Sequence, residues 1–152
     1  MKLYFLRHGD ATWPDWQAPD DERPLTKKGK KQIKKVAKFI ADEDIGPIAI
    51  VSSPLPRACE SADIVAEELN AEVTEDPALA PGFDIDRLST ILKAFPGQDV
   101  MLVGHEPGLS RVIKALGGGE VRLPKAGLAR VDLAEGEELR GELIWLLPAK
   151  VI

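Results

Sequence analysis

Cysteine and histidine are scarce in this chain of 152 residues. Cys59 is the only cysteine, so no internal disulfide can form and a cysteine-based zinc site is excluded. His8 and His105 are the only histidines, which argues against a histidine-rich metal site. We therefore expect no metal and no other cofactor.

Long apolar runs and an excess of positive charge are also lacking. No apolar run approaches the ~18 residues of a membrane span, and the segment before Arg7 is too short for a signal peptide. The net charge of −5 has the wrong sign for a dedicated nucleic-acid binder. The common nucleotide-binding glycine motifs do not occur either. We expect a cytoplasmic protein with no membrane and no nucleic-acid partner.

What is present is a regular alternation of apolar and amphipathic segments, without repeats or linkers, which predicts one domain over residues 1–152. Strands are expected at 2–7, 48–51, 72–75, 100–103, 127–133 and 142–147, and helices from Thr26, from Pro56, from Asp84 and over 109–116. Such alternation predicts a three-layer α/β/α domain with a mostly parallel sheet. No helix separates the last two strands, so an antiparallel edge is expected.

The helix that begins near Thr26 combines an apolar face with a lysine-rich one. The lysines are Lys27, Lys28, Lys30, Lys31, Lys34, Lys35 and Lys38. A solvated surface is the simpler interpretation of this face, and a binding patch is the alternative.

Residues suited to a phosphoryl group follow three of the predicted strands. The first strand leads into Arg7 and His8, the second leads within a few residues to Arg57, and strand 100–103 leads to His105. Ligands of open α/β sheets bind at the carboxyl ends of the strands, so these side chains are expected to converge. Each alone is typical of a surface loop, a helix start or a cap, and only the joint pattern indicates a site.

The residue types fit phosphoryl transfer. The planar fork of arginine binds phosphoryl oxygens in pairs. A neutral imidazole is a competent nucleophile near neutral pH because its reference pKa is about 6.5. One histidine would attack phosphorus to give a phosphohistidine that water later hydrolyses, while the other histidine and the arginines stabilise the transition state. Fixed cations of this kind make a metal unnecessary.

Several segments resemble the histidine phosphatase superfamily, also called phosphoglycerate mutase-like. Leu6-Arg7-His8-Gly9 is similar to its signature, and the other similar segments occur in the family's order. These are Pro24-Leu25-Thr26 with Gly29, Ser52-Ser53-Pro54 with Arg57-Ala58, and Val103-Gly104-His105. The short length, Gly9-Asp10-Ala11 and Gly104-His105-Glu106-Pro107 are most similar to the SixA-type phosphohistidine phosphatases.

The resemblance implies a role for each matching residue. His8 would be the phosphorylated nucleophile, Arg7 and Arg57 would clamp the phosphoryl oxygens next to Gly9, and His105 would donate a hydrogen bond to them. Larger relatives use an acidic residue as proton donor, and SixA-type members often have Glu before Leu-x-Pro in the corresponding loop. This chain has Ala78 there. Asp10, Asp84 and Asp86 stay candidate acids beside simpler loop or capping roles.

The missing acid favours a particular substrate. An alkoxide leaving group needs a proton during P–O cleavage, whereas the imidazole of a phosphohistidine is far less basic. The leading hypothesis is therefore a metal-independent phosphatase that acts on phosphohistidine in a signalling or phosphotransfer protein. A phosphatase for small esters such as sugar phosphates is one alternative, and a phosphate-binding module without turnover is another.

Three further groups of residues have roles that the sequence leaves open. Trp13 and Trp16 either line the mouth of the site or pin the long loop that follows His8. Glu106 either orients His105 or favours the start of the next helix. Lys125 and Gly127 precede a late strand and are candidates to approach the site.

Overall fold

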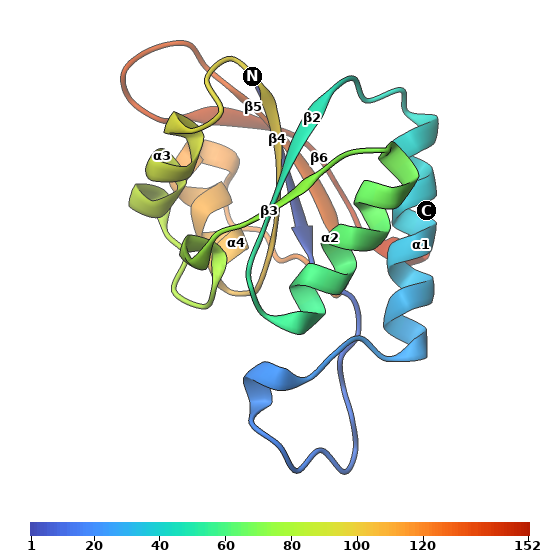
Figure 1. Ribbon diagram of the computed structural model, residues 1–152. Coiled ribbons are helices and arrows are strands. Elements are labelled where there is room, and N and C mark those ends of the chain that lie inside the picture. Colours follow the sequence, from blue (N-terminus) through green and yellow to red (C-terminus); the bar gives the residue numbers. More distant parts are fainter.

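Six strands form one sheet with helices on both of its faces (Figure 1). The computed structural model describes residues 1–152. The strands are β1 Lys2–Arg7, β2 Ile48–Ser52, β3 Val73–Glu75, β4 Asp99–Gly104, β5 Leu128–Leu133 and β6 Gly141–Leu147. The helices are α1 Lys27–Asp42, α2 Pro56–Leu69, α3 Ile85–Lys93 and α4 Gly108–Ile113, with short turns η1 Asp20–Glu22, η2 Pro77–Leu79, η3 Lys114–Gly118 and η4 Ala149–Val151.

The order of the strands is β3-β2-β4-β1-β5-β6. The pairs β3–β2, β2–β4 and β4–β1 are parallel, and the pairs β1–β5 and β5–β6 are antiparallel. The predicted fold, a mostly parallel sheet with an antiparallel edge, is confirmed. The reversal at the edge follows from the sequence, because a short glycine-containing turn joins β5 to β6 where a parallel pair needs a crossover.

The two faces of the sheet bury two separate apolar cores. In β1, Leu3 and Phe5 pack toward α3 and α4, whereas Tyr4 and Leu6 pack toward α1 and α2. Alternate residues of a strand point to opposite faces, so burial of both faces requires an uninterrupted apolar run. Each fully buried Leu or Phe stabilises the fold by roughly 1.5–3 kcal/mol.

The helices begin where the sequence predicts. The largest difference from the prediction is at the end of α4. Thr26 caps α1 by accepting a hydrogen bond from the amide of Gly29 at 3.1 Å. The helix predicted over 109–116 instead ends at Ile113 and widens into η3, which includes Gly117 at a φ of +108°. Only glycine adopts that conformation readily. The glycine run therefore first changes the path of the chain and then ends the helical segment. None of the helices has the length and apolar composition needed to cross a bilayer.

Parallel pairing brings three loops together at the end of the sheet where β1, β2 and β4 have their carboxyl ends. Arg7 at the end of β1 pairs with Gly104 of β4, and Ser52 of β2 pairs with Val103. The loops that follow these strands therefore start side by side. The loop after β1 projects away from the body of the molecule, and η1 lies on the part of the loop that returns toward α1 (Figure 1).

Candidate active site

A pocket of about 230 Å³ lies at this end of the sheet. Its lining residues are Arg7, His8, Ala11, Thr12, Arg23, Arg57, Pro81, His105, Glu106 and Lys125. The structure thus gathers the four side chains to which the sequence analysis gives chemical roles. Four of the lining residues carry a positive charge and one carries a negative charge. A pocket of this composition attracts a small, highly charged anion.

A hydrogen bond of His8 determines which of its ring nitrogens can act as a nucleophile. Its Nδ1 lies 2.7 Å from the carbonyl oxygen of Gly9, and a carbonyl can only accept, so Nδ1 carries the proton. In the neutral ring, Nε2 then holds the free electron pair. Burial, together with the charges of Arg57 and Arg7, lowers the pKa of His8 to about 4, although the hydrogen bond to Gly9 acts in the opposite direction. His8 is therefore neutral at pH 7.

His105 lies beside His8, with the two ring centroids 5.3 Å apart. Its Nε2 is 2.7 Å from the hydroxyl oxygen of Ser53, and its Nδ1 is buried without a partner. Burial lowers the pKa of His105 to about 3, and His8 and Arg57 add to the effect. A buried nitrogen without a partner is costly, so this group is suited to binding a ligand atom.

Two buried neutral imidazoles make the stability of the fold depend on pH. Above the unfolded-state pKa of about 6.5 a histidine is neutral whether the chain is folded or not. As the pH falls toward about 4, the unfolded chain binds protons that folded His8 and His105 do not. We expect the free energy of unfolding, measured by urea denaturation, to drop by a few kcal/mol over this range.

The control for this effect is the double variant His8→Asn with His105→Asn, which keeps every carboxylate. Its free energy of unfolding should change much less between these pH values. Equal slopes for the double variant and the parent chain would contradict the assignment of the effect to the two imidazoles.

Arg7 and Arg57 reach the pocket from β1 and from the first turn of α2. Arg7 donates a hydrogen bond to the carbonyl oxygen of Leu123 at 3.1 Å, and its Nε is buried without a partner. Arg57 donates to the carbonyl oxygen of Asp20 at 3.2 Å. Each guanidinium has five N–H groups, so both are held in place with donors to spare. They can bind the oxygens of a phosphoryl group without moving.

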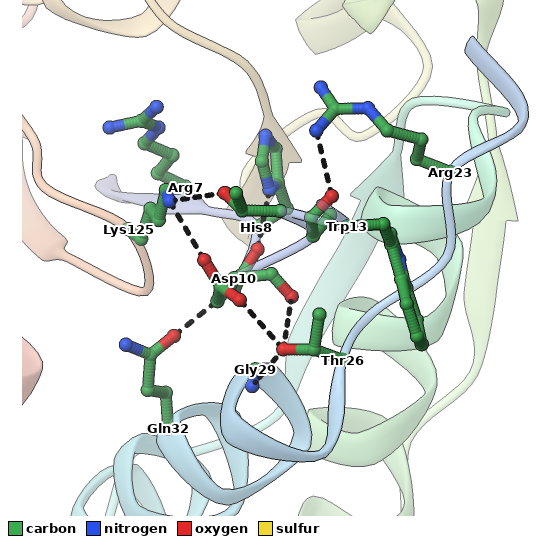
Figure 2. Close-up of polar contacts among 12 residues, drawn as sticks. Arg7, His8, Asp10, Trp13, Arg23, Thr26, Gly29, Gln32 and Lys125 are labelled. Atoms are coloured by element: carbon green, nitrogen blue, oxygen red, sulfur yellow. Dashed lines mark hydrogen bonds and ion pairs between the residues drawn. The ribbon is translucent and has the colours of Figure 1, made fainter. Parts of the chain in front are cut away.

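Arg23 and Lys125 complete the positive lining of the pocket. Arg23 donates to the carbonyl oxygen of Ala11 at 2.7 Å (Figure 2). It also forms an ion pair with Asp20 at 2.8 Å. Sequence reasoning missed Arg23, although it directly precedes the Pro24-Leu25-Thr26 segment. The Lys125 ammonium group approaches the site, as suggested from the sequence, and contacts Asp10 and Thr12 at 2.8 Å each.

Hydrogen bonds from two distant elements hold the Asp10 carboxylate in its ionised form, which disfavours a role as proton donor. It accepts hydrogen bonds from Lys125 at 2.8 Å and from Thr26 at 2.7 Å (Figure 2). Burial alone would raise its pKa, but these bonds outweigh that effect and lower it to about 2. Asp84 caps α3, and Asp86 is exposed in the first turn of that helix. None of the three candidate acids lines the pocket.

Glu106 is the only carboxylate in the lining. It accepts hydrogen bonds from the amides of Ser110 at 2.9 Å and Leu123 at 3.3 Å. These contacts match the expected role at the start of α4 and include none with His105. Glu106 thereby ties α4 to the segment whose carbonyl group holds Arg7.

Gly9 brings the loop after β1 against α1 and α2. A Cβ atom on Gly9 would lie 2.7 Å from the carbonyl oxygen of Gly29, so no side chain fits there. Its amide donates to the hydroxyl of Ser61 at 3.2 Å, and that hydroxyl donates to the carbonyl oxygen of Arg57 at 2.7 Å. The close contact explains the two glycines and links the His8 loop to the helix that carries Arg57.

The two tryptophans hold the projecting loop. The indole of Trp13 donates to the carbonyl oxygen of Pro24 at 2.9 Å, and that of Trp16 donates to Pro19 at 3.0 Å. The two rings pack together with their centroids 6.2 Å apart. Neither ring is in the pocket lining, so the contacts favour the pinning role over the mouth of the site.

Comparison with known protein families identifies the family to which this fold belongs. A family model described as the histidine phosphatase superfamily (branch 1) matches residues 3–81, which contain Arg7, His8 and Arg57. The chain belongs to the histidine phosphatase superfamily. The resemblance carried by the sequence segments is thereby confirmed.

Relatives of this histidine phosphatase span almost its whole length. An uncharacterized protein of Picosynechococcus sp. strain PCC 7002 is 34% identical and covers 97% of this chain and 100% of the relative. The phosphohistidine phosphatase SixA of Escherichia coli K12 is 27% identical over 89% of this chain and 87% of the relative. A solved structure of the protein histidine phosphatase SixA complexed with tungstate has a TM-score of 0.88 at 25% identity, covering 99% of both chains.

Proposed function

We propose that this histidine phosphatase hydrolyses phosphohistidine on a protein, through a phosphoryl group held covalently on Nε2 of His8 and without a metal. The observation that carries the proposal is the state of His8. Its imidazole is neutral, its free electron pair is assigned to Nε2 by the hydrogen bond to Gly9, and it lies in a pocket lined by four cations. A nucleophile fixed in this way suits attack on an anionic phosphoryl group.

The reaction consists of two displacements at phosphorus. In the first, the electron pair on Nε2 of His8 forms a bond to phosphorus. The substrate ring carries a proton on its other nitrogen, so when the P–N bond breaks with its electrons staying on that ring, it leaves as a neutral imidazole. In the second, water forms the new P–O bond, the bond to Nε2 breaks, and the proton from water ends on phosphate or solvent. His8 returns to its starting tautomer because Gly9 still accepts from Nδ1.

The charged lining stabilises both transition states. Arg7 and Arg57 bind the equatorial oxygens with donors that are already held in position. For His105, a hydroxyl proton donated by Ser53 to Nε2 leaves the ring proton on the unpartnered Nδ1, where it can meet a phosphoryl oxygen. These fixed donors supply the charge stabilisation that a metal ion would otherwise give.

The carboxylates around the pocket favour a P–N substrate over a phosphate ester. Asp10 is held ionised by Lys125 and Thr26, and Glu106 accepts two backbone hydrogen bonds. Asp10 is not in the pocket lining, and both oxygens of Glu106 are occupied by hydrogen bonds from Ser110 and Leu123. A departing alkoxide would need a proton donor here, whereas a departing imidazole needs less help. The names of the SixA relatives agree with this substrate, and tungstate in one of them is a tetrahedral oxyanion like phosphate.

The test is a comparison of substrates in the presence of EDTA. The panel contains a protein phosphorylated on histidine, free phosphohistidine and a set of sugar phosphates. We expect kcat/KM for the phosphohistidine protein to exceed that for every sugar phosphate by at least about tenfold, which corresponds to about 1.4 kcal/mol. Faster hydrolysis of a sugar phosphate would overturn the substrate assignment. Tight binding of the phosphoprotein with no phosphate release would identify a binding module instead.

A further inference from the structure

We propose that a positively charged surface beside the pocket docks an acidic face of the phosphorylated substrate protein. This surface, called the docking surface below, consists of Lys28, Lys31 and Lys35 on α1 together with Arg122 and Lys150. All five side chains are exposed. The inference rests on the proposed function and adds where, and by what chemistry, the substrate protein is held.

A groove next to the pocket forms the centre of the docking surface. It has a volume of about 600 Å³ and shares Lys125 with the pocket that contains His8. Its lining residues are Gln32, Arg122, Pro124, Lys125, Leu146, Pro148, Ala149 and Lys150. They include three cations and no carboxylate, although acidic residues outnumber basic ones in the chain as a whole. The positive charge of the pocket therefore continues outward in this direction.

Helix α1 extends this charge from the groove. The side chain of Gln32 lines the groove and accepts a hydrogen bond from the amide of Asp10 at 2.9 Å, so this part of α1 lies against the His8 loop (Figure 2). Lys28 and Lys35 are four residues before and three residues after Gln32, which places them next to it on the helix surface. Lys31 is on the same exposed side. A protein seated in the groove would meet these lysines.

The composition of α1 is unfavourable for an isolated surface helix. It has seven lysines and only one acidic residue, Asp42, at its last position. Pairs such as Lys27–Lys31 and Lys31–Lys35 repel each other, and lysines in the first turn oppose the helix dipole. A merely solvated face would be more stable with glutamates among the lysines. The uniform charge is explained if an acidic partner neutralises it.

The neighbourhood of the groove favours a protein as the occupant. Its floor contains apolar groups from Leu146, Pro148 and Ala149, and its rim is cationic, which is the pattern of protein interfaces. The apolar face of α1 is buried in the core through Ile33 and Ile40, so this helix cannot insert into a membrane.

The test compares two charge reversals in the full chain. The test variant is Lys35→Glu with Lys150→Glu, and the matched control is Lys93→Glu with Arg140→Glu, which reverses two exposed charges outside the docking surface. The probes are an acidic carrier protein phosphorylated on histidine with phosphoramidate, and free phosphohistidine. We expect the test variant to lower kcat/KM for the carrier protein by about tenfold at low salt, through a slower association. The control should stay within about twofold of the parent chain.

Two further measurements separate the outcomes. Free phosphohistidine should be hydrolysed equally by all three proteins, and kcat/KM of the parent chain for the carrier protein should fall steeply between about 30 mM and about 300 mM salt. Equal losses in the test and control variants, or binding of anionic phosphatidylserine vesicles to the docking surface with unchanged kinetics on the carrier protein, would overturn the inference. If the parent chain hydrolyses neither probe, the proposed function itself is wrong.

Discussion

His8→Ala should lower kcat on a phosphohistidine substrate by at least about 10⁴-fold, because it removes the atom that accepts the phosphoryl group. The arginines and His105 would remain and would still bind the substrate, so KM should change much less than kcat. The direct measurement is rapid denaturation of the parent chain during turnover with a radiolabelled substrate. We expect an acid-labile label on His8 in the parent chain and none in the variant.

His8→Asn is the matched control for this result. Its amide can still donate to the carbonyl oxygen of Gly9, so the local structure is retained while the nucleophile is lost. Both variants should bind tungstate, which separates a missing nucleophile from a collapsed pocket. A label found on His105 in the parent chain would reverse the roles assigned to the two histidines.

Arg57→Ala should lower kcat/KM by about 10²–10³-fold, the range found when one preorganised donor is removed from a transition-state site. Arg57 is 6% exposed and comes from the first turn of α2, so its charge is delivered by a rigid element in a partly dehydrated pocket. The loss should also weaken inhibition by tungstate. Steady-state kinetics and a tungstate inhibition curve are the measurements.

Arg57→Lys and Arg87→Ala complete this experiment. The lysine keeps the charge but cannot bind two oxygens in a fixed fork, so it should recover only part of the activity. Arg87 is exposed on α3 and is absent from the pocket lining, so its loss should leave kcat/KM unchanged. Full activity in Arg57→Ala would remove this residue from the proposed mechanism.

The layered fold could be predicted from the sequence because the apolar residues of its strands and helices recur with clear periods. The apolar run Leu3–Leu6 alternates between two cores, and the β1 segment ends where the polar residues begin. The antiparallel edge followed from the missing helix between β5 and β6. The end of α4 could not be predicted from periodicity, because the transition into η3 depends on the glycine run and on packing against β6.

The convergence of Arg7, His8, Arg57 and His105 could also be predicted, since parallel strands deliver their carboxyl ends to one edge. Arg23 could not be placed by that argument. It belongs to a loop without periodicity, whose path is fixed by indole-to-carbonyl bonds and by the ion pair of Arg23 with Asp20. These contacts join residues whose proximity no local pattern shows.

Asp10 illustrates a second limit of sequence reasoning. A carboxylate two residues after a nucleophile suggests proton transfer, yet its partners come from distant elements. Lys125 is 115 residues away in sequence, and Thr26 is the cap of α1. The same side chain could be an acid or an anchor, and only tertiary contacts distinguish these roles.

The reversed direction of β5 has a consequence for redesign. Leu128 at its first position pairs with Leu6 near the end of β1, so the chain enters β5 at the pocket instead of leaving it there. The entering stretch, residues 119–127, has exposed residues at its start. Further along, Leu123 and Ala126 are buried, and their backbone groups form hydrogen bonds with Arg7 and His8. Extra residues inserted at the exposed start of this stretch would lengthen the chain beside the site without displacing a helical layer, because surface loops tolerate insertion at small entropic cost. Confining the insertion to residues 119–122 leaves the backbone contacts of Arg7 and His8 in place.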